Sequence, residues 1–447
     1  MRRGFDFDAA LCVGCNACNA ACILENGFQA GTRSILSWNS EALPLLSVIN
    51  LSMACNHCEK PPCLEGCPSM AYTLDSTGAV IHHQDRCMGC RYCTWRCPYD
   101  APKINEVKGF IEKCHFCTER TTDGIEPACV TACPTGALRM TQLDEFPSAD
   151  IEWFPETDIR PSLRLRGTEK RSGPLIIPVD DPGPDEEESI PSVFTTKVLK
   201  EWSLLIFSLL LTAASALIIA YALTGEEPAV KLPAIMLTVA LIISFAHLGV
   251  PAKGWRAILN VASSPLSREI LMVIITTVMA YLNWLRPGTI HPFIHAVAAL
   301  MTLISADLVF FSADRSPALK LHSGQVFFSG IFMASWFIVP STVFLVFSML
   351  AAVSVIMRYR SLEKGQLIRS LYYLRALSIP AVFMLLYPGS KITTAVAFII
   401  LMAGIAADRA LFIDDFSPVN IKETISDHFN TEYEKERDKQ RQNTGLS

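Results

Sequence analysis

Apolar residues are spread unevenly along the chain. From about Glu201 onward, long apolar runs alternate with short polar joints, whereas the preceding part offers only short strands and turns in segments such as "GAVIHH" and "TGALRM". Each run holds roughly 20 residues, the length that a helix needs to cross a bilayer. The pattern predicts membrane-spanning helices over 202–224, 232–251, 268–286, 291–311, 324–340, 341–358, 370–387 and 391–412.

The segment 324–358 decides between seven and eight helices. It is long for one helix and short for two, with Pro340 at the candidate turn. With eight helices, most Lys and Arg residues of the joints fall on the face that carries the N-terminal part, and with seven this asymmetry largely vanishes. Positive residues favour the cytoplasmic side of a membrane. We therefore expect eight helices with both termini inside, and keep seven as the alternative.

Composition agrees with a protein that is only partly membrane-embedded. The 447 residues are 51% hydrophobic, and the mean hydropathy is +0.32. The formal net charge of −5 makes no case for nucleic-acid binding. Arg2 and Arg3 open the sequence, but "GFDFDAALCVGC" follows where a signal peptide needs an apolar stretch, so we expect no export signal.

The predicted domains follow these shifts in composition. We expect residues 1–140 to form a cysteine-rich domain. The following segment, 141–196, is rich in Pro and acidic residues, so we expect it to be an extended strap and linker. Residues 197–415 form the membrane part, and 416–447 are a charged C-terminal tail.

All 16 cysteines lie between Cys12 and Cys133. The first and third groups share one spacing, and a proline follows the last cysteine of the second, third and fourth groups. The four groups are Cys12, Cys15, Cys18 and Cys22; Cys55, Cys58, Cys63 and Cys67; Cys87, Cys90, Cys93 and Cys97; and Cys114, Cys117, Cys129 and Cys133.

This spacing is typical of ferredoxins, in which three closely spaced thiolates bind one cubane cluster and the fourth binds its neighbour. Zinc sites use Cys-x2-Cys pairs separated by a longer finger, which fits the fourth group at best. Cysteines two residues apart do not readily meet disulfide geometry. The sequence therefore predicts four 4Fe–4S clusters. The expected fold class is an α+β double-ferredoxin-like iron–sulfur domain followed by an all-α transmembrane bundle of about eight helices.

Two ionisable residues stand out in the membrane part. His247 lies near the end of the second predicted helix, and Glu269 opens the third at the same face. Ionisable groups at such depth are costly and are functional candidates, and a histidine beside a carboxylate suits a quinol, whose oxidation releases protons with electrons. In the alternative reading, His247 only caps a helix and Glu269 interacts with a helix dipole. Asp307 and Arg409 are weaker candidates. His247 and His295 are the main histidines within the predicted membrane part, and they lack the paired pattern that two haems would need.

The motifs that carry these residues resemble known subunits. "CNHCEKPPCLEGCPS", "CMGCRYCTWRCPY" and "GFIEKCHFC" resemble the four-cluster subunit of dimethyl sulfoxide reductase-type molybdoenzymes, over about 4–140. "KEWSLLIF", "HLGVP" and "SPLSREI" resemble the eight-helix anchor subunit of the same enzymes, over about 198–413. The protein thus resembles a fusion of two subunits that are normally separate.

The resemblance also implies a ligand set for each cluster. In the subunits that the protein resembles, group one exchanges its fourth cysteine with group four, and group two exchanges its fourth cysteine with group three. Some relatives have Trp at the position of Cys90 and hold a three-iron cluster there, so the retained Cys90 implies four cubanes. The implied sets are Cys12, Cys15, Cys18 and Cys133; Cys114, Cys117, Cys129 and Cys22; Cys55, Cys58, Cys63 and Cys97; and Cys87, Cys90, Cys93 and Cys67.

The resemblance also implies a function. Menaquinol would be oxidised at His247 and Glu269, and electrons would enter at the Cys87 cluster and leave near the Cys12 cluster for a separate molybdopterin subunit that reduces the terminal acceptor in anaerobic respiration. We therefore expect a non-catalytic oxidoreductase subunit in the cell inner membrane, with the iron–sulfur domain on the cytoplasmic face, or on the periplasmic face if it is co-exported with a partner. The reverse flow, with a dehydrogenase partner reducing quinone, stays open. A hypothesis of a different class is a membrane permease with an attached redox sensor. Such a protein should have internal repeats and helices broken at the midplane of the membrane, and the sequence shows neither clearly.

Overall fold

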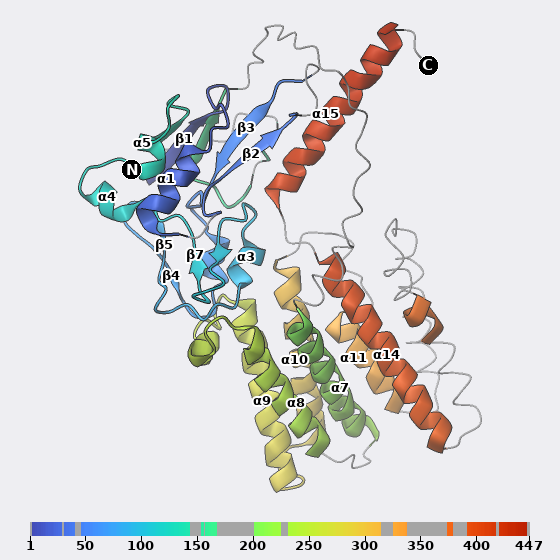
Figure 1. The fold of residues 1–447 in the computed structure, drawn as a ribbon. Coiled ribbons are helices and arrows are strands. Elements are labelled where there is room, and N and C mark those ends of the chain that lie inside the picture. Colours follow the sequence, from blue (N-terminus) through green and yellow to red (C-terminus); the bar gives the residue numbers. More distant parts are fainter. Residues whose placement is uncertain are drawn as a thin grey trace. The chain divides into compact units, whose positions relative to one another are not determined.

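The computed structural model divides into two compact units (Figure 1). The first contains Met1–Gly183 together with Pro418–Ser447, and the second contains Pro184–Ser417. The structure describes residues 2–28, 31–40, 46–143, 153–155, 157–167, 201–224, 231–313, 325–337, 373–378, 391–416 and 420–444.

A three-stranded sheet forms one part of the first unit. Its central strand β1 (Arg2–Asp8) pairs antiparallel with β8 (Leu138–Leu143) and parallel with β9 (Leu163–Arg166). Phe5 and Phe7, two residues apart on β1, are both buried, as expected for side chains on one face of a strand. The strand β9 lies in the segment expected to be a linker, so part of that segment belongs to the sheet.

Among the described residues before 168, the remaining strands form three antiparallel hairpins, and the helices are short. The hairpins are β2 (Ser34–Trp38) with β3 (Ile49–Met53), β4 (Tyr72–Leu74) with β5 (Val80–His82), and β6 (Lys103–Ile104) with β7 (Ile111–Glu112). The helices in this part are α1 (Ala17–Asn26), α2 (Pro62–Glu65), α3 (Tyr92–Arg96), α4 (Thr118–Thr122) and α5 (Ala128–Thr131). Cysteines make up much of the buried core of this unit.

The C-terminal segment, expected as a charged tail, contains the helix α15 (Ile421–Thr444). Its first turns bury Ile421, Ile425 and Phe429 in the core of the first unit. The ring of Phe429 lies 5.7 Å from that of Trp38, whose indole N–H donates to Ser426 Oγ at 3.0 Å. Burying one phenylalanine side chain stabilises a fold by about 1.5–3 kcal/mol, so this half of the helix is firmly docked.

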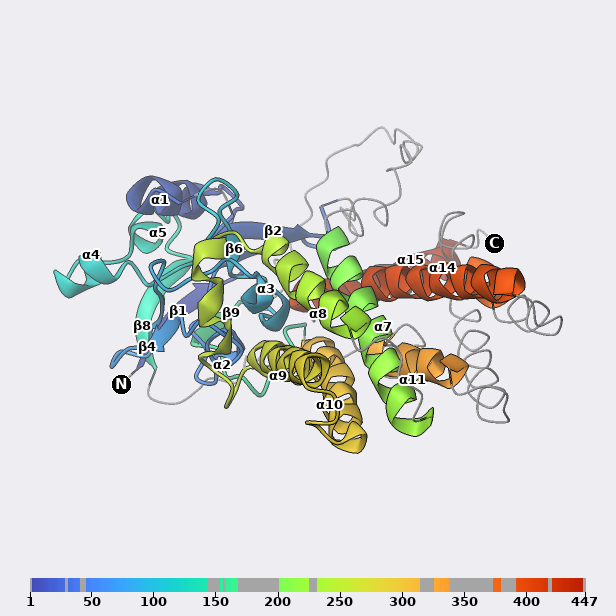
Figure 2. The same cartoon turned by 90° about the horizontal axis from the view of Figure 1, so that it is seen from below.

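The second unit is a helical bundle in which α7 (Trp202–Thr224) packs against its neighbours (Figure 2). Among the described residues, four helices are long and apolar enough to span a membrane: α7, α9 (Pro265–Leu285), α10 (Pro292–Phe311) and Val396–Asp414 of α14 (Lys391–Asp415). Proline at the first position suits the starts of α9 and α10, and Ser264 caps α9 by accepting from the Ser267 N–H at 3.4 Å. These helices support a membrane-spanning region.

The segment 232–251 does not form one straight helix. It contains α8 (Lys231–Ser244) and the 3-10 turn Phe245–His247, and the backbone then bends by 117° into a second 3-10 helix, Pro251–Ile258. A Cβ at Gly254 would lie 2.3 Å from the ring of Phe245, so glycine permits this close approach. Counting the bent pair as one span gives up to five spans in the described residues.

The predicted helix count stays a prediction. The short apolar helix α11 (Val326–Phe337) occupies most of the fifth predicted span. The sixth, 341–358, and all of 370–387 except the helical residues 373–378 lie outside the described residues.

Candidate functional site

Three cavities in the first unit are each lined by four cysteines, and each set combines different parts of the sequence. The empty space within them, open solvent included, is about 310, 330 and 240 Å³, respectively. The lining cysteines are Cys12, Cys15, Cys18 and Cys133; Cys55, Cys58, Cys63 and Cys97; and Cys22, Cys114, Cys117 and Cys129.

The remaining cysteines, Cys67, Cys87, Cys90 and Cys93, also gather in one place. Burial raises the pKa of Cys90, and the nearby thiols of Cys67 and Cys87 raise it further. Burial likewise raises the pKa of Cys93, which lies within electrostatic reach of the other three. The backbone N–H of Ala71 donates to Cys67 Sγ at 3.3 Å. The structure thus brings together each of the four predicted sets.

The sequence folds this way because the cysteine loops turn sharply. Asn16, Arg91 and Cys117, which precede α1, α3 and α4, all have positive φ, a region that side chains other than glycine rarely adopt. Gly14, with φ of 71°, sits between Cys12 and Cys15, and a Cβ there would lie 3.1 Å from Asn50 Oδ1. These turns direct successive thiols inward.

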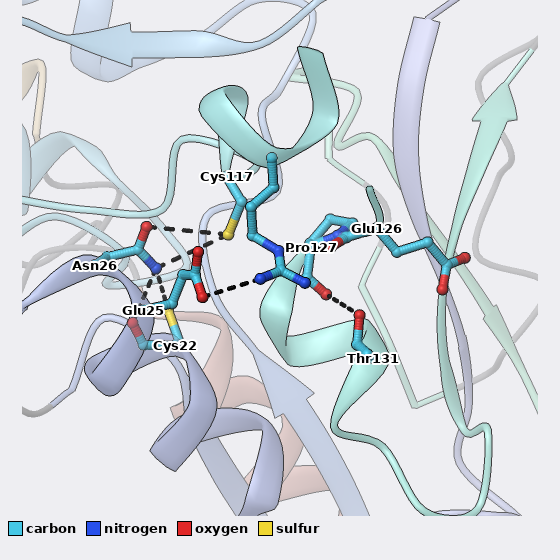
Figure 3. A network of polar contacts seen from close by, with 8 residues as sticks. Cys22, Glu25, Asn26, Cys117, Glu126, Pro127 and Thr131 are labelled. Carbon is cyan, nitrogen blue, oxygen red and sulfur yellow. Dashed lines mark hydrogen bonds and ion pairs between the residues drawn. The ribbon is translucent and has the colours of Figure 1, made fainter. Parts of the chain in front are cut away.

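An amide joins thiols from two different groups. Asn26 Nδ2 lies 3.8 Å from Cys22 Sγ on α1 and 3.8 Å from Cys117 Sγ at the start of α4 (Figure 3). Nearby, Arg120 Nη1 forms an ion pair with Glu25 Oε2 at 3.0 Å, which also links these two helices. The fourth cysteine of group one is therefore held beside group four.

An aromatic stack connects the second and fourth groups. His57, between Cys55 and Cys58, stacks on Phe116 with ring centroids 3.6 Å apart. Its Nδ1 accepts the Val80 backbone N–H at 3.0 Å. Burial, followed by the charge of Lys113, holds the pKa of His57 well below its usual value, so the imidazole is neutral.

Two buried cations lie among the cysteines and were missed by sequence reasoning. Arg33 is 1% exposed and Lys113 is 3% exposed. Lys113 Nζ donates to the carbonyl oxygens of Val80 at 2.5 Å and Cys114 at 2.7 Å. The position of Lys113 directly before Cys114 is a signal that the sequence does contain, whereas nothing near Arg33 in the sequence marks it.

The four-thiol sets fit cubane clusters. Buried polar groups normally have hydrogen-bond partners, yet Arg33 Nε and Nη2 have none among the described residues, as suits donors that would face cluster sulfur atoms. Four thiolates are the usual ligands of a 4Fe–4S cluster. In the part of the sequence that the structure describes, no three His, Cys, Asp or Glu side chains form a group that could hold a single metal ion.

In the second unit, His247 and Glu269 occupy different surroundings. His247 is half-buried and ends the 3-10 turn at the 117° bend. The helix after the bend carries Lys253, Trp255 and Arg256, and Trp255 is 63% exposed. Basic and aromatic residues of this kind are typical of a membrane–water interface.

Glu269 is buried within the bundle, where its charge interacts with Arg409 and Asp307. Arg409 Nε donates to Ser208 Oγ on α7 at 3.0 Å. The Asp307 carboxylate accepts the backbone N–H groups of Val326 and Phe327, both at 2.8 Å, and so caps α11. The sequence singled out these three ionisable residues separately, and the structure brings them together.

Comparison with known proteins identifies the first unit. A family model described as "4Fe-4S dicluster domain" matches residues 46–143. The protein is 37% identical to the B subunit of anaerobic dimethyl sulfoxide reductase from Haemophilus influenzae, over 36% of this sequence and 88% of the relative. It belongs to the family of these B subunits. It is also 38% identical to the corresponding subunit of Escherichia coli, over 32% of this sequence and 75% of the relative.

Some similar proteins are named as subunits of other reductases. The B subunit of polysulfide reductase from Wolinella succinogenes is 38% identical, over 32% of this sequence and 78% of the relative. The dicluster model includes the second, third and fourth cysteine groups, and group one precedes it. The apolar helices of the second unit are consistent with a B subunit fused to a membrane anchor.

Proposed function

We propose that this protein is the electron-transfer and membrane-anchoring subunit of a reductase complex, which oxidises quinol and passes electrons to a separate molybdopterin subunit. The observation that carries the proposal is the gathering of cysteines from distant groups into four-thiol sets in a protein that also has apolar helices long enough to span a membrane. Relatives named as B subunits of dimethyl sulfoxide and polysulfide reductases support a role in such a complex.

The proposed cofactors are four 4Fe–4S clusters, which carry single electrons when bound. Their proposed ligands are the four sets Cys12, Cys15, Cys18 and Cys133; Cys22, Cys114, Cys117 and Cys129; Cys55, Cys58, Cys63 and Cys97; and Cys67, Cys87, Cys90 and Cys93. The protein's own part is to fix the thiols and to keep water away from most of them. Only Cys15 is exposed among the sixteen, which favours the Cys12 set as the one facing a partner.

The proposed quinol site contains His247 and Glu269. A neutral imidazole can accept a hydrogen bond from a quinol hydroxyl and take its proton, since its unperturbed pKa of about 6.5 lies near working pH. Glu269 and Asp307 offer buried carboxyl groups that can hold or pass on a proton, and Arg409 places a positive charge beside them. The interfacial character of the helix after His247 supports a site at the membrane surface.

The proposed location is the cell inner membrane, with the first unit in the cytoplasm. The basic residues Lys253 and Arg256 directly after the bend support this side. The proposed partner is a molybdopterin-containing catalytic subunit, because the relatives are named as single subunits of reductases, and an electron-transfer subunit needs another subunit that reduces the substrate.

Replacement of His247 tests this function. In the anaerobically purified full-length protein, His247→Ala should slow reduction of the clusters by a menaquinol analogue at least about 100-fold, the lower range for loss of a general base. Dithionite should still reduce all clusters. Glu269→Gln should slow the reaction less and shift its pH dependence.

The matched control is His291→Asn. His291 is an exposed histidine of the same unit that caps α10 by accepting the Phe293 N–H at 3.3 Å, and asparagine preserves a cap. This variant should retain the wild-type rate. If His247→Ala also reacts at the wild-type rate, the quinol site lies elsewhere.

A further inference from the structure

Arg33 is a fully buried cation with two unused donors. It directly precedes β2 and is 1% exposed. Its guanidinium lies 4.7 Å from the centroid of the Phe5 ring, and Nη1 donates to Ser52 Oγ at 2.9 Å. Within the described residues, Nε and Nη2 have no hydrogen-bond partner. Leaving such donors unsatisfied destabilises a fold, and more so when the group is charged.

The groups around Arg33 are thiols of two different sets. Ser52 Oγ, which holds the guanidinium, also lies 3.3 Å from Cys18 Sγ, in the first cavity. Cys22, Cys114 and Cys129, which line the third cavity, are within electrostatic reach. Burial works to lower the pKa of Arg33, but these thiols, Cys129 foremost, raise it above its usual value.

The charge of Arg33 is not balanced by a carboxylate in the described part of the structure. Among those residues, no Asp or Glu forms an ion pair with Arg33, although buried cations normally have such a partner. A cluster with four thiolate ligands carries negative charge, and its reduction potential depends on net charge and on hydrogen bonds to its sulfur atoms. A buried cation with available N–H groups beside two ligand sets matches both requirements.

We propose that Arg33 sets the reduction potentials of the clusters in the Cys12 and Cys114 sets, by placing a positive charge and two N–H donors beside their sulfur atoms. Positive charge and hydrogen bonds stabilise the more negative, reduced state, so Arg33 raises both potentials. Loss of the Arg33 charge should therefore make this pair of clusters harder to reduce. The inference rests on the proposed cluster ligands and is independent of the proposed quinol site.

Redox titration of the anaerobically purified full-length protein, followed by EPR with chemical mediators, tests this role. Arg33→Met removes the charge at similar length. It should lower two of the four potentials by an amount that changes the one-electron equilibrium about tenfold, or about 59 mV, and leave the other two in place. Arg33→Lys keeps the charge and should recover at least half of the shift.

The control is Arg3→Met. Arg3 is a half-buried arginine on β1 whose Nη1 donates to Thr121 Oγ1 at 2.9 Å, and its loss should leave all four potentials unchanged. Iron content is measured for each variant. If Arg33→Met binds less iron, Arg33→Gln provides the comparison, because it removes the charge, keeps a side-chain N–H donor and should shift the same two potentials less.

Unchanged potentials in a fully loaded Arg33→Met, or an equal shift of all four, would overturn the proposal. The mediators make the titration independent of quinol, so a failure to oxidise quinol speaks against the proposed site at His247 and leaves this result intact. A wild-type protein that binds no iron would instead refute the proposed cofactors.

Discussion

Cys18 and Cys22 lie one helical turn apart on α1, yet they line different cavities. Side chains four residues apart lie on the same face of a helix, so one short element brings two ligand sets close together. Cys22 reaches the cysteines of group four, and Cys133 reaches those of group one. This exchange ties the first and last cysteine groups together and explains how a domain with few regular elements holds its shape.

The exchange makes a prediction about cluster loss. Cys22→Ser and Cys129→Ser should remove the same cluster, because both thiols line the third cavity. Cys18→Ser, only four residues from Cys22, should remove a different one. EPR spectra of the reduced protein, with iron content as the control, distinguish these outcomes. If Cys18→Ser and Cys22→Ser remove the same signal, the ligand sets follow the sequence groups and the exchange is wrong.

Spacing alone could predict cysteine ligation but could not reveal the residues between the clusters. Two, two and three residues separate successive cysteines of group one, so this pattern is visible within a short stretch of sequence. The turns at Gly14 and Asn16, which position these cysteines, lie within the same stretch. Arg33, by contrast, lies near the cysteines only because folding brings β1, β2 and the third cavity together. No local pattern distinguishes such a buried arginine from a surface one.

The helix α15 has a consequence for membrane topology. It belongs to the same compact unit as residues 1–183, and its backbone joins that unit directly, since the Ile421 N–H donates to the Pro98 carbonyl oxygen at 2.9 Å. Parts of one folded unit lie on one side of a membrane. We therefore predict that the polypeptide leaves and returns on the same side of the membrane, with an even number of spans and thus eight rather than seven.

Reporter fusions test this topology. Fusions at Ser447 and at Glu226, which follows the first span, should report opposite sides of the membrane, with Ser447 in the cytoplasm. The first span separates the two positions, and an even count returns the C-terminus to the starting side. Reports from the same side would show that the spans are miscounted, and an outside Ser447 would reverse the proposed orientation.

At the same scale, hydrophobic runs were a good guide to helix existence and a poorer guide to helix ends. The predicted span 202–224 coincides with α7. The bend after His247 was not predicted, because Leu248 and Val250 continue the apolar run although the backbone turns there. The packing of α15 against the first unit was also not predicted. Ile421, Ile425 and Phe429 recur every four residues, but most other residues of this segment are charged or polar, so the segment was expected to be an exposed tail.

The whole molecule combines two units of different composition in one polypeptide, a cysteine-rich unit and a unit of apolar helices. The first unit uses cysteines and short elements to form metal sites, as its B-subunit relatives indicate. The second buries several ionisable groups inside a bundle of apolar helices, and three of them, Glu269, Asp307 and Arg409, interact with one another. Composition along the sequence predicted this division. The interactions among the three buried ionisable groups depend on helix packing and could not be read from it.

Iron and acid-labile sulfide analysis of the anaerobically purified full-length protein tests the central claim most directly. Sixteen cysteines in four sets of four predict about sixteen irons and sixteen sulfides per molecule, without zinc. Eight irons or fewer, together with stoichiometric zinc, would contradict four cubane clusters and with them the proposed electron-transfer function.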